Sequence, residues 1–207
     1  MADYQDGILD RFAWASAEFS WRLRLVEPDH WELPTPCPAW DVRRLVNHVT
    51  RGNLNYVRLA QGGSAAEFLE MRDVDALASD PVGAYAASVR TCLDEFGQPG
   101  ALQRLLDYPL GPIEGGQALA VRTTDTVIHA WDLAQVIKQG RHLDPDLVSW
   151  IDGNIDAIYA GLPETPVAAE TTHRFFAEPE ESDDEDASPQ DRLLRLMGRK
   201  PTVDPTH

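Results

Sequence analysis

One stretch of the sequence, residues 117–138, constrains the fold most, because it combines helical periodicity with ionisable side chains on the apolar face. Asp125, His129 and Asp132 are spaced i, i+4 and i+7, so a helix places them on one face. That face also carries apolar residues, namely Val121, Ile128 and Val136. Burying a lone charge is costly, and buried charges are normally paired or bound to metal. The helix therefore needs partner elements that supply counter-charges or further metal ligands.

Several other segments have the periodicity and the boundary signals of helices. Asp41 is expected to cap one of them, and Asp-Pro pairs begin two others. The predicted helices span residues 8–26, 42–59, 81–96 and 145–159, with a short one at 189–196. The proline-rich residues 33–40 favour an extended connection, and residues 102–113 are either two short strands or a loop. The pattern predicts an all-α fold, a four-helix bundle with extra C-terminal helices.

A metal site on this bundle needs a third ligand, because the Asp125–His129 pair supplies only two. His48 is the best candidate, since it lies two turns into its own predicted helix at the border of an apolar stripe. One carboxylate and two imidazoles suit Zn²⁺, Ni²⁺, Fe²⁺ or Mn²⁺ better than Ca²⁺, and three protein ligands leave coordination positions free. The spacing alone is equally compatible with a plain i, i+4 pair of Asp125 and His129, and with His48 as a hydrogen-bonded core residue. Asp132 is expected to orient a ligand or to play a structural role.

Charge and composition exclude several classes of function. A formal net charge of -16 argues against nucleic acid and anionic membrane surfaces as partners. No apolar run approaches the roughly 20 residues that span a bilayer, and residues 1–10 have no features of a secretion signal. Only two cysteines occur, Cys37 and Cys92, which favours a reducing cytoplasm over a disulfide framework. Cys37 is read as a small packed residue or as a reactive thiol near a helix start.

Three motifs resemble the mycothiol-dependent maleylpyruvate isomerase family, a branch of the DinB-like superfamily of metal-binding bundles. The first reads TPCPAWDVR at residues 35–43 and continues with LVNHV at 45–49. The second reads DTVIHAWDLA at residues 125–134, and the ending DRLLRLMGR at 191–199 matches an uncharacterised branch. Together the resemblance covers residues 8–201. It implies a DinB-like four-helix bundle with one long crossover, and a metal held by His48, Asp125 and His129.

This chain departs from the family pattern at one candidate ligand, and the resemblance also implies a type of reaction. Maleylpyruvate isomerases have Glu where this chain has Asp125, which weakens the transfer of isomerase activity more than that of metal binding. The resemblance implies a low-molecular-weight thiol such as mycothiol as cosubstrate, because a divalent metal, zinc above all, favours the thiolate. The thiolate then adds to a small electrophile by transfer or isomerisation. Arg43, Arg51 and Arg122 are candidates to bind carboxylates of substrate or cosubstrate.

Two other functions remain open at this point. One is thiol-independent, a metal-assisted hydrolase or natural-product tailoring enzyme, and the other is a non-enzymatic metal or small-molecule binding protein. We expect a bundle domain over residues 1–175, followed by an acidic loop and a short helix over 176–207 that packs on the bundle or moves freely. The expected protein is cytoplasmic, monomeric or homodimeric, and acts on a small molecule.

Overall fold

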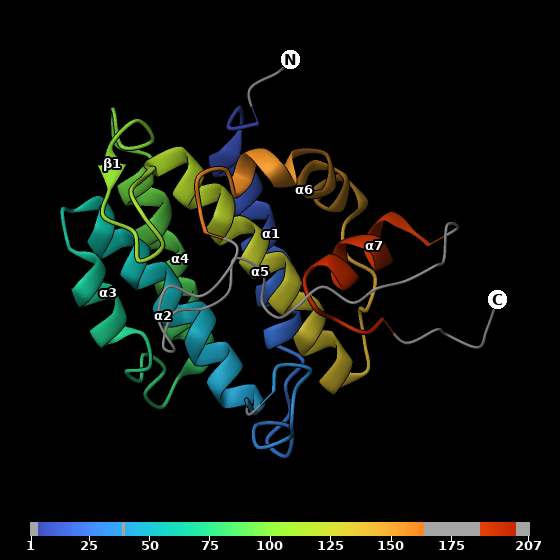
Figure 1. Ribbon diagram of the computed structural model, residues 1–207. Coiled ribbons are helices and arrows are strands. Elements are labelled where there is room, and N and C mark those ends of the chain that lie inside the picture. Colours follow the sequence, from blue (N-terminus) through green and yellow to red (C-terminus); the bar gives the residue numbers. More distant parts are fainter. Residues whose placement is uncertain (1–3, 39, 164–186, 202–207) are drawn as a thin grey trace.

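The computed structural model describes residues 4–38, 40–163 and 187–201, and its ribbon is mostly helical (Figure 1). The elements in chain order are α1 (Ile8–Leu23), α2 (Val42–Ala60), α3 (Ala65–Met71), α4 (Pro81–Phe96), β1 (Leu105–Leu106), β2 (Ile113–Glu114), α5 (Gly115–Ile137), α6 (Pro145–Ile158) and α7 (Pro189–Leu196). The predicted all-α class is confirmed, and the stretch at 102–113 contributes the two short strands of an antiparallel hairpin. None of the described helices is long and apolar enough to cross a membrane.

Side-chain caps begin several helices, as their sequence signals predict. Asp41 Oδ1 accepts a hydrogen bond from Arg44 N at 2.8 Å, and the side chain of Asp80 accepts one from Gly83 N. Such caps satisfy amide groups that have no partner inside the helix. Two boundaries differ from the predicted ones. Helix α1 ends three residues early, because the chain continues in tight turns after Leu23, and α5 begins at Gly115, directly after β2.

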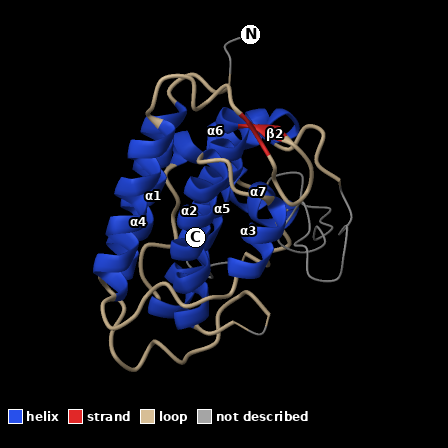
Figure 2. Ribbon diagram, turned by 90° about the vertical axis from the view of Figure 1, so that its left-hand side faces the viewer, coloured by secondary structure: helices blue, strands red, loops and turns tan. Residues whose placement is uncertain are grey.

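The bundle consists of α1, α2, α4 and α5, which run alongside one another (Figure 2). Helix α1 packs against α4 and α5, and α2 packs against the same two helices from the opposite side. Helices α1 and α2 are therefore diagonal to each other, and residues 24–41 cross the bundle end to connect them. This long connection contains the proline-rich segment, and it confirms the expected DinB-like arrangement.

The proline-rich segment folds back on itself before α2 begins. Thr35 N and its hydroxyl both donate to Trp40 O at 3.0 Å, and an isolated bridge pairs Pro34 with Asp41. Thr35 Oγ1 also accepts a hydrogen bond from Cys37 N. The resulting turn is held next to the start of α2, which brings Cys37 and Trp40 over the helices of the bundle.

Smaller elements cover the two flanks of α5. In Figure 1, α3 and β1 lie on one side of the bundle, and α6 and α7 lie on the other. Helix α7 packs on α6, and its Leu193 and Leu194 are completely buried, as is Met197 directly after it. The predicted division at residues 175 and 176 stays a prediction, since the acidic run at 178–186 lies outside the described residues.

Candidate metal centre

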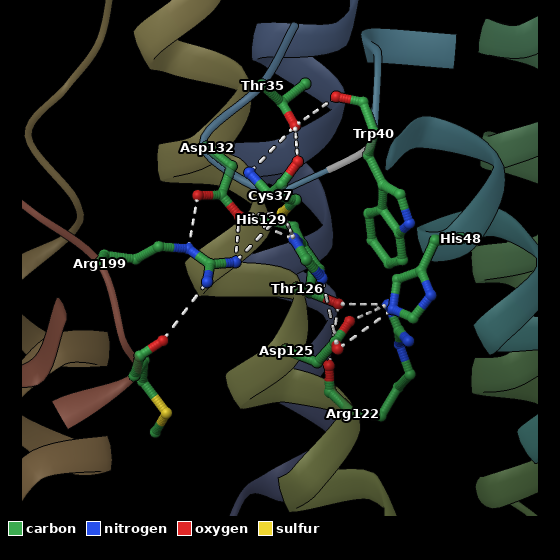
Figure 3. A network of polar contacts seen from close by, with 11 residues as sticks. Thr35, Cys37, Trp40, His48, Arg122, Asp125, Thr126, His129, Asp132 and Arg199 are labelled. Atoms are coloured by element: carbon green, nitrogen blue, oxygen red, sulfur yellow. Dashed lines mark hydrogen bonds and ion pairs between the residues drawn. The ribbon is translucent and has the colours of Figure 1, made fainter. Parts of the chain in front are cut away.

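His48 of α2 and Asp125 and His129 of α5 meet where these two helices face each other (Figure 3). His48 Nε2 lies 3.3 Å from Asp125 Oδ1, and His129 Nε2 lies 3.5 Å from the same oxygen. One ligand atom from each residue lies within 4.8 Å of the other two. Two ligands bound tetrahedrally to zinc are roughly 3.3 Å apart, given Zn–N and Zn–O bonds of about 2.0–2.1 Å. The spacing of the two nitrogens from the carboxylate oxygen thus fits a divalent metal ion.

The protonation of His129 provides a second test of this fit. Its Nδ1 lies 2.9 Å from Asp132 Oδ2, and an ionised carboxylate only accepts hydrogen bonds, so Nδ1 is the donor. In a neutral imidazole the lone pair is then on Nε2, which faces Asp125 Oδ1. The lone pairs of His129 Nε2 and Asp125 Oδ1 repel each other unless a cation lies between the two atoms. The pair can share either a proton or a metal ion, and the donor set of nitrogen and oxygen suits zinc and its transition-metal neighbours.

The pKa shifts agree with this arrangement of charges. Burial acts to lower the pKa of His129, but Asp125 and Asp132 outweigh it and hold the pKa well above the ordinary value. Burial acts to raise the pKa of Asp125, yet Arg122 and the two histidines keep it well below the ordinary value. Burial lowers the pKa of His48 despite the neighbouring carboxylate. Ionised Asp125 and neutral His48 are in the protonation state that binds a metal, whereas His129 would release the proton from Nε2 on binding one.

Asp132 is fixed in turn by Arg199, which follows α7. The guanidinium donates from Nε to Oδ1 at 2.8 Å and from Nη2 to Oδ2 at 2.7 Å. Asp132 is 0% and Arg199 is 2% exposed, so the ion pair is removed from water. Arg199 therefore orients Asp132, and Asp132 orients His129, in the way that carboxylates behind metal-bound histidines do.

Cys37 lies against the same ion pair, within the turn before α2. Its Sγ is 3.2 Å from Asp132 Oδ2, 3.2 Å from Arg199 Nη2 and 3.8 Å from His129 Nδ1. Burial is the main reason that the pKa of Cys37 is raised, although His129 and Arg199 act to lower it. A buried, hydrogen-bonded thiol with a raised pKa matches the packed-residue interpretation of Cys37 rather than the reactive one.

A cavity of about 240 Å³ adjoins the three candidate ligands. His48, Asp125 and His129 line one end of it, together with Trp40. The indole ring of Trp40 lies 4.7 Å from the His48 ring and 5.8 Å from the His129 ring, between centroids. Two turns of α2 beyond His48, Tyr56 and the rings of Phe68 and Tyr108 that contact it form an aromatic end. Leu110, Tyr159 and Leu162 also line the cavity.

The three arginines singled out from the sequence have different positions. Arg122 is 2% exposed, lines the cavity, and has Nη2 2.7 Å from Asp125 Oδ2. Arg43 donates to Asp75 and to the backbone of Ala78, and it lines a second cavity of about 200 Å³. Arg51 donates to the backbone oxygens of residues 74 and 75 and lines neither cavity. A role for Arg43 and Arg51 in binding stays a prediction.

Sequence reasoning missed Arg199 and the aromatic end of the cavity. The motif at 191–199 included Arg199 but gave it no partner, because nothing in local spacing connects it with Asp132. The available signal was the buried position of Asp132, which requires a counter-charge from elsewhere in the chain. Tyr56 and Phe68 had no signal beyond ordinary apolar periodicity.

The described residues form an all-α bundle of the DinB-like fold, with one carboxylate and two imidazoles converging from facing helices. The profile of the family described as mycothiol maleylpyruvate isomerase N-terminal domain matches residues 12–134, more than half of the chain. The chain belongs to this family.

Individual proteins and solved structures are also similar to this chain. An uncharacterized protein from each of two strains of Mycobacterium tuberculosis is 34% identical over 133 residues, which are 64% of this chain and 69% of the relative. The crystal structure of the mycothiol-dependent maleylpyruvate isomerase is similar, with a TM-score of 0.53 and 16% identity over 66% of this chain and 69% of that one. A structure of a histidine mutant of that isomerase gives a TM-score of 0.55 over the same shares. At this identity the structural likeness establishes the fold.

Proposed function

We propose that this protein is a divalent-metal-dependent enzyme that activates a low-molecular-weight thiol of the mycothiol type for transfer to, or isomerisation of, a small electrophile. His48, Asp125 and His129 would hold the metal, with zinc the best fit to the donor set. The observation that carries the proposal is the convergence of two imidazole nitrogens on one carboxylate oxygen at a cavity wall. Membership of a family named for a mycothiol-dependent isomerase supports the thiol.

The bound metal would supply one piece of chemistry, namely a preference for the thiolate form of a thiol at neutral pH. The residues of the chain do the remaining work. Asp132 holds the proton of His129 on Nδ1, which keeps Nε2 directed at the cavity. Trp40 covers both histidine rings and limits access of water. Arg122 is the buried cation closest to Asp125, so it is suited to hold an anionic group of the electrophile.

The two cavities offer separate places for the two reactants. Trp40, His48 and Arg72 line both, so the cavities meet at one of the candidate ligands. The second cavity is lined by charged and polar side chains, including Arg43 and Arg44. We infer that it receives the polar body of the thiol, while the electrophile occupies the first cavity. With this assignment, Arg43 keeps its predicted role, which is to bind a carboxylate of the substrate or cosubstrate.

Metal content tests the first part of the proposal. We expect His48→Ala to bind zinc at least roughly tenfold more weakly. Even the loss of a residue that hydrogen-bonds to a metal ligand typically costs 10–100-fold in metal affinity or activity. His142→Ala is the matched control, because its imidazole is exposed and lies outside both cavities. Equal zinc retention by the two variants, measured by elemental analysis and competition with a chelator, would contradict the site.

Thiol chemistry is tested separately. The zinc-loaded protein should accelerate consumption of mycothiol in the presence of a panel of small unsaturated acids and other electrophiles, and the His48→Ala protein should not. If fully zinc-loaded protein leaves every thiol and electrophile unchanged, the thiol-dependent activity is wrong even though the metal site stands.

A further inference from the structure

Three aromatic rings form one end of the cavity that adjoins the candidate ligands, away from those ligands. Tyr56 of α2, Phe68 of α3 and Tyr108 of the hairpin loop have ring centroids 5.7–5.9 Å apart in all three pairs. The two tyrosine hydroxyls are 3.2 Å apart and hydrogen-bond to each other, which satisfies them without a ligand. Burial raises the pKa of both tyrosines, so this wall is uncharged at neutral pH.

Helix α2 connects this aromatic end with the metal-ligand end. His48, Gly52 and Tyr56 follow one another at intervals of four residues, so all three share the face that lines the cavity. Eight residues of helix correspond to about 12 Å along the axis. A ligand in the cavity thus meets imidazoles at one end and aromatic rings at the other.

Arg122 lies between the two ends. Its Nη2 pairs with Asp125, and its guanidinium carbon is 6.0 Å from the centre of the Tyr56 ring. Its Nε is buried and has no hydrogen-bond partner among the described residues, although a charged guanidinium normally uses its donors. A Cβ at position 52 would collide with the guanidinium, so Gly52 provides the space for it.

We propose that the electrophilic substrate is an unsaturated monocarboxylic acid with an aromatic or comparably bulky hydrocarbon group, bound with that group against Tyr56, Phe68 and Tyr108 and its carboxylate at Arg122. This inference rests on the proposed function and adds the substrate class to it. Pockets for drug-sized ligands measure roughly 300–1,000 Å³. The cavity of about 240 Å³ is smaller, so it suits an acid smaller than a drug molecule.

The same geometry disfavours small dicarboxylates. With one carboxylate at Arg122, a second one directed at the aromatic end would lie among Phe68, Leu110 and the tyrosines, which carry no positive charge. The other two arginines of the lining, Arg72 and Arg199, already form ion pairs with Asp73 and Asp132. Stripping an ion of water without a counter-charge is strongly unfavourable. The aromatic end is therefore the part of the site that selects between substrates.

Binding of unreactive or slowly reacting acids tests the proposal directly. The full-length protein, with and without zinc, is titrated by calorimetry with trans-cinnamate and with maleate in the absence of thiol. We expect trans-cinnamate to bind at least tenfold more tightly than maleate. Maleate binding as tightly as trans-cinnamate, or more tightly, would overturn the proposal.

Two neighbouring residues of α3 provide a matched pair of variants. Phe68 lines the cavity, whereas Leu69 is 36% exposed and does not. Phe68→Ala should weaken trans-cinnamate binding by about tenfold and leave maleate unchanged, and Leu69→Ala should change neither. Phe68→Leu keeps apolar packing without the ring and serves if the alanine variant is unstable, with an intermediate loss expected. Equal affinity of all three variants and the unmodified protein for trans-cinnamate refutes the aromatic subsite.

The outcomes separate this inference from the proposed function. Thiol consumption with small dicarboxylates, combined with no binding of trans-cinnamate, would leave the thiol enzyme standing and reject the aromatic subsite. Binding of trans-cinnamate that depends on Phe68, without any thiol turnover, would keep the subsite and reject the thiol chemistry.

Discussion

Replacing Arg199 by alanine tests how far the candidate metal centre depends on a residue outside the three candidate ligands. The guanidinium makes two charge-assisted hydrogen bonds to Asp132, at 2.8 and 2.7 Å, and both side chains are at most 2% exposed. Among the described residues, the substitution leaves the buried Asp132 carboxylate with His129 and the Cys37 thiol as its remaining partners. Asp132, which orients His129 through Nδ1, is then no longer held in place by Arg199.

The magnitude follows from the burial of the pair. Removing one partner of a buried ion pair typically destabilises a protein by about 3–5 kcal/mol, because an uncompensated charge remains inside. In a chain of this length each kcal/mol shifts the melting temperature by roughly 2–4 °C. We therefore expect Arg199→Ala to lower Tm by about 10 °C, and to weaken zinc binding by roughly tenfold or more through His129.

Thermal unfolding and zinc competition measure both effects, with Arg192→Ala as the control. Arg192 lies on α7, where its ion pair with Asp152 is long and half exposed, at 3.8 Å, and it donates one hydrogen bond to Ala187 O. Its loss leaves no buried charge unpaired, so it should cost much less than the loss of Arg199. The double variant Arg199→Ala with Asp132→Asn should be more stable than Arg199→Ala alone, because the unpaired charge is gone. Additive losses in the double variant, or a Tm for Arg199→Ala equal to that of Arg192→Ala, would refute the reasoning.

Three further predictions use separate observations. Gly52→Ala should displace the Arg122 guanidinium, so carboxylate binding should weaken at least tenfold by calorimetry while zinc content is retained. Burial raises the pKa of Cys37 and raises that of Cys92 to about 12, so iodoacetamide at pH 8 should label neither in the folded protein and both in urea, as read by mass spectrometry. The folded-state pKa of Asp132 is lowered, so its stabilisation is present above the unfolded value of about 3.9 and is lost as pH falls through the folded one. Acid unfolding below about pH 4 should accordingly be shallower in Asp132→Asn, and an unchanged slope would argue against this role.

The fold follows from the sequence because its determinants are local. Helix starts at Asp41 and Asp80 depend on side chains that reach amides three residues away, and these can be recognised without any tertiary structure. The helix ends were predicted less accurately than the helix starts. Leu23 ends α1 before the apolar pattern stops, because residues 24–41 must turn to cross the bundle end.

The site was only partly accessible to sequence reasoning. The spacing of Asp125 and His129 limits how the two can be arranged on a helix, and the motif around His48 suggested the partner. The contact between Asp132 and Arg199 depends on how α7 docks on α6, which no local pattern encodes. The aromatic end of the cavity likewise arises only when α2, α3 and the hairpin loop are packed together.

The contact between Cys37 and Arg199 also has a consequence for the order of folding. It joins residues 162 positions apart, whereas the helices form from contacts three or four positions apart. Long-range closure is slow compared with helix formation, since the entropy of a large loop must be lost before the contact forms. The bundle should therefore assemble first, before Arg199 reaches Cys37 and Asp132. Docking of the segment that carries Arg199 onto Cys37 and Asp132 should then be a late kinetic step.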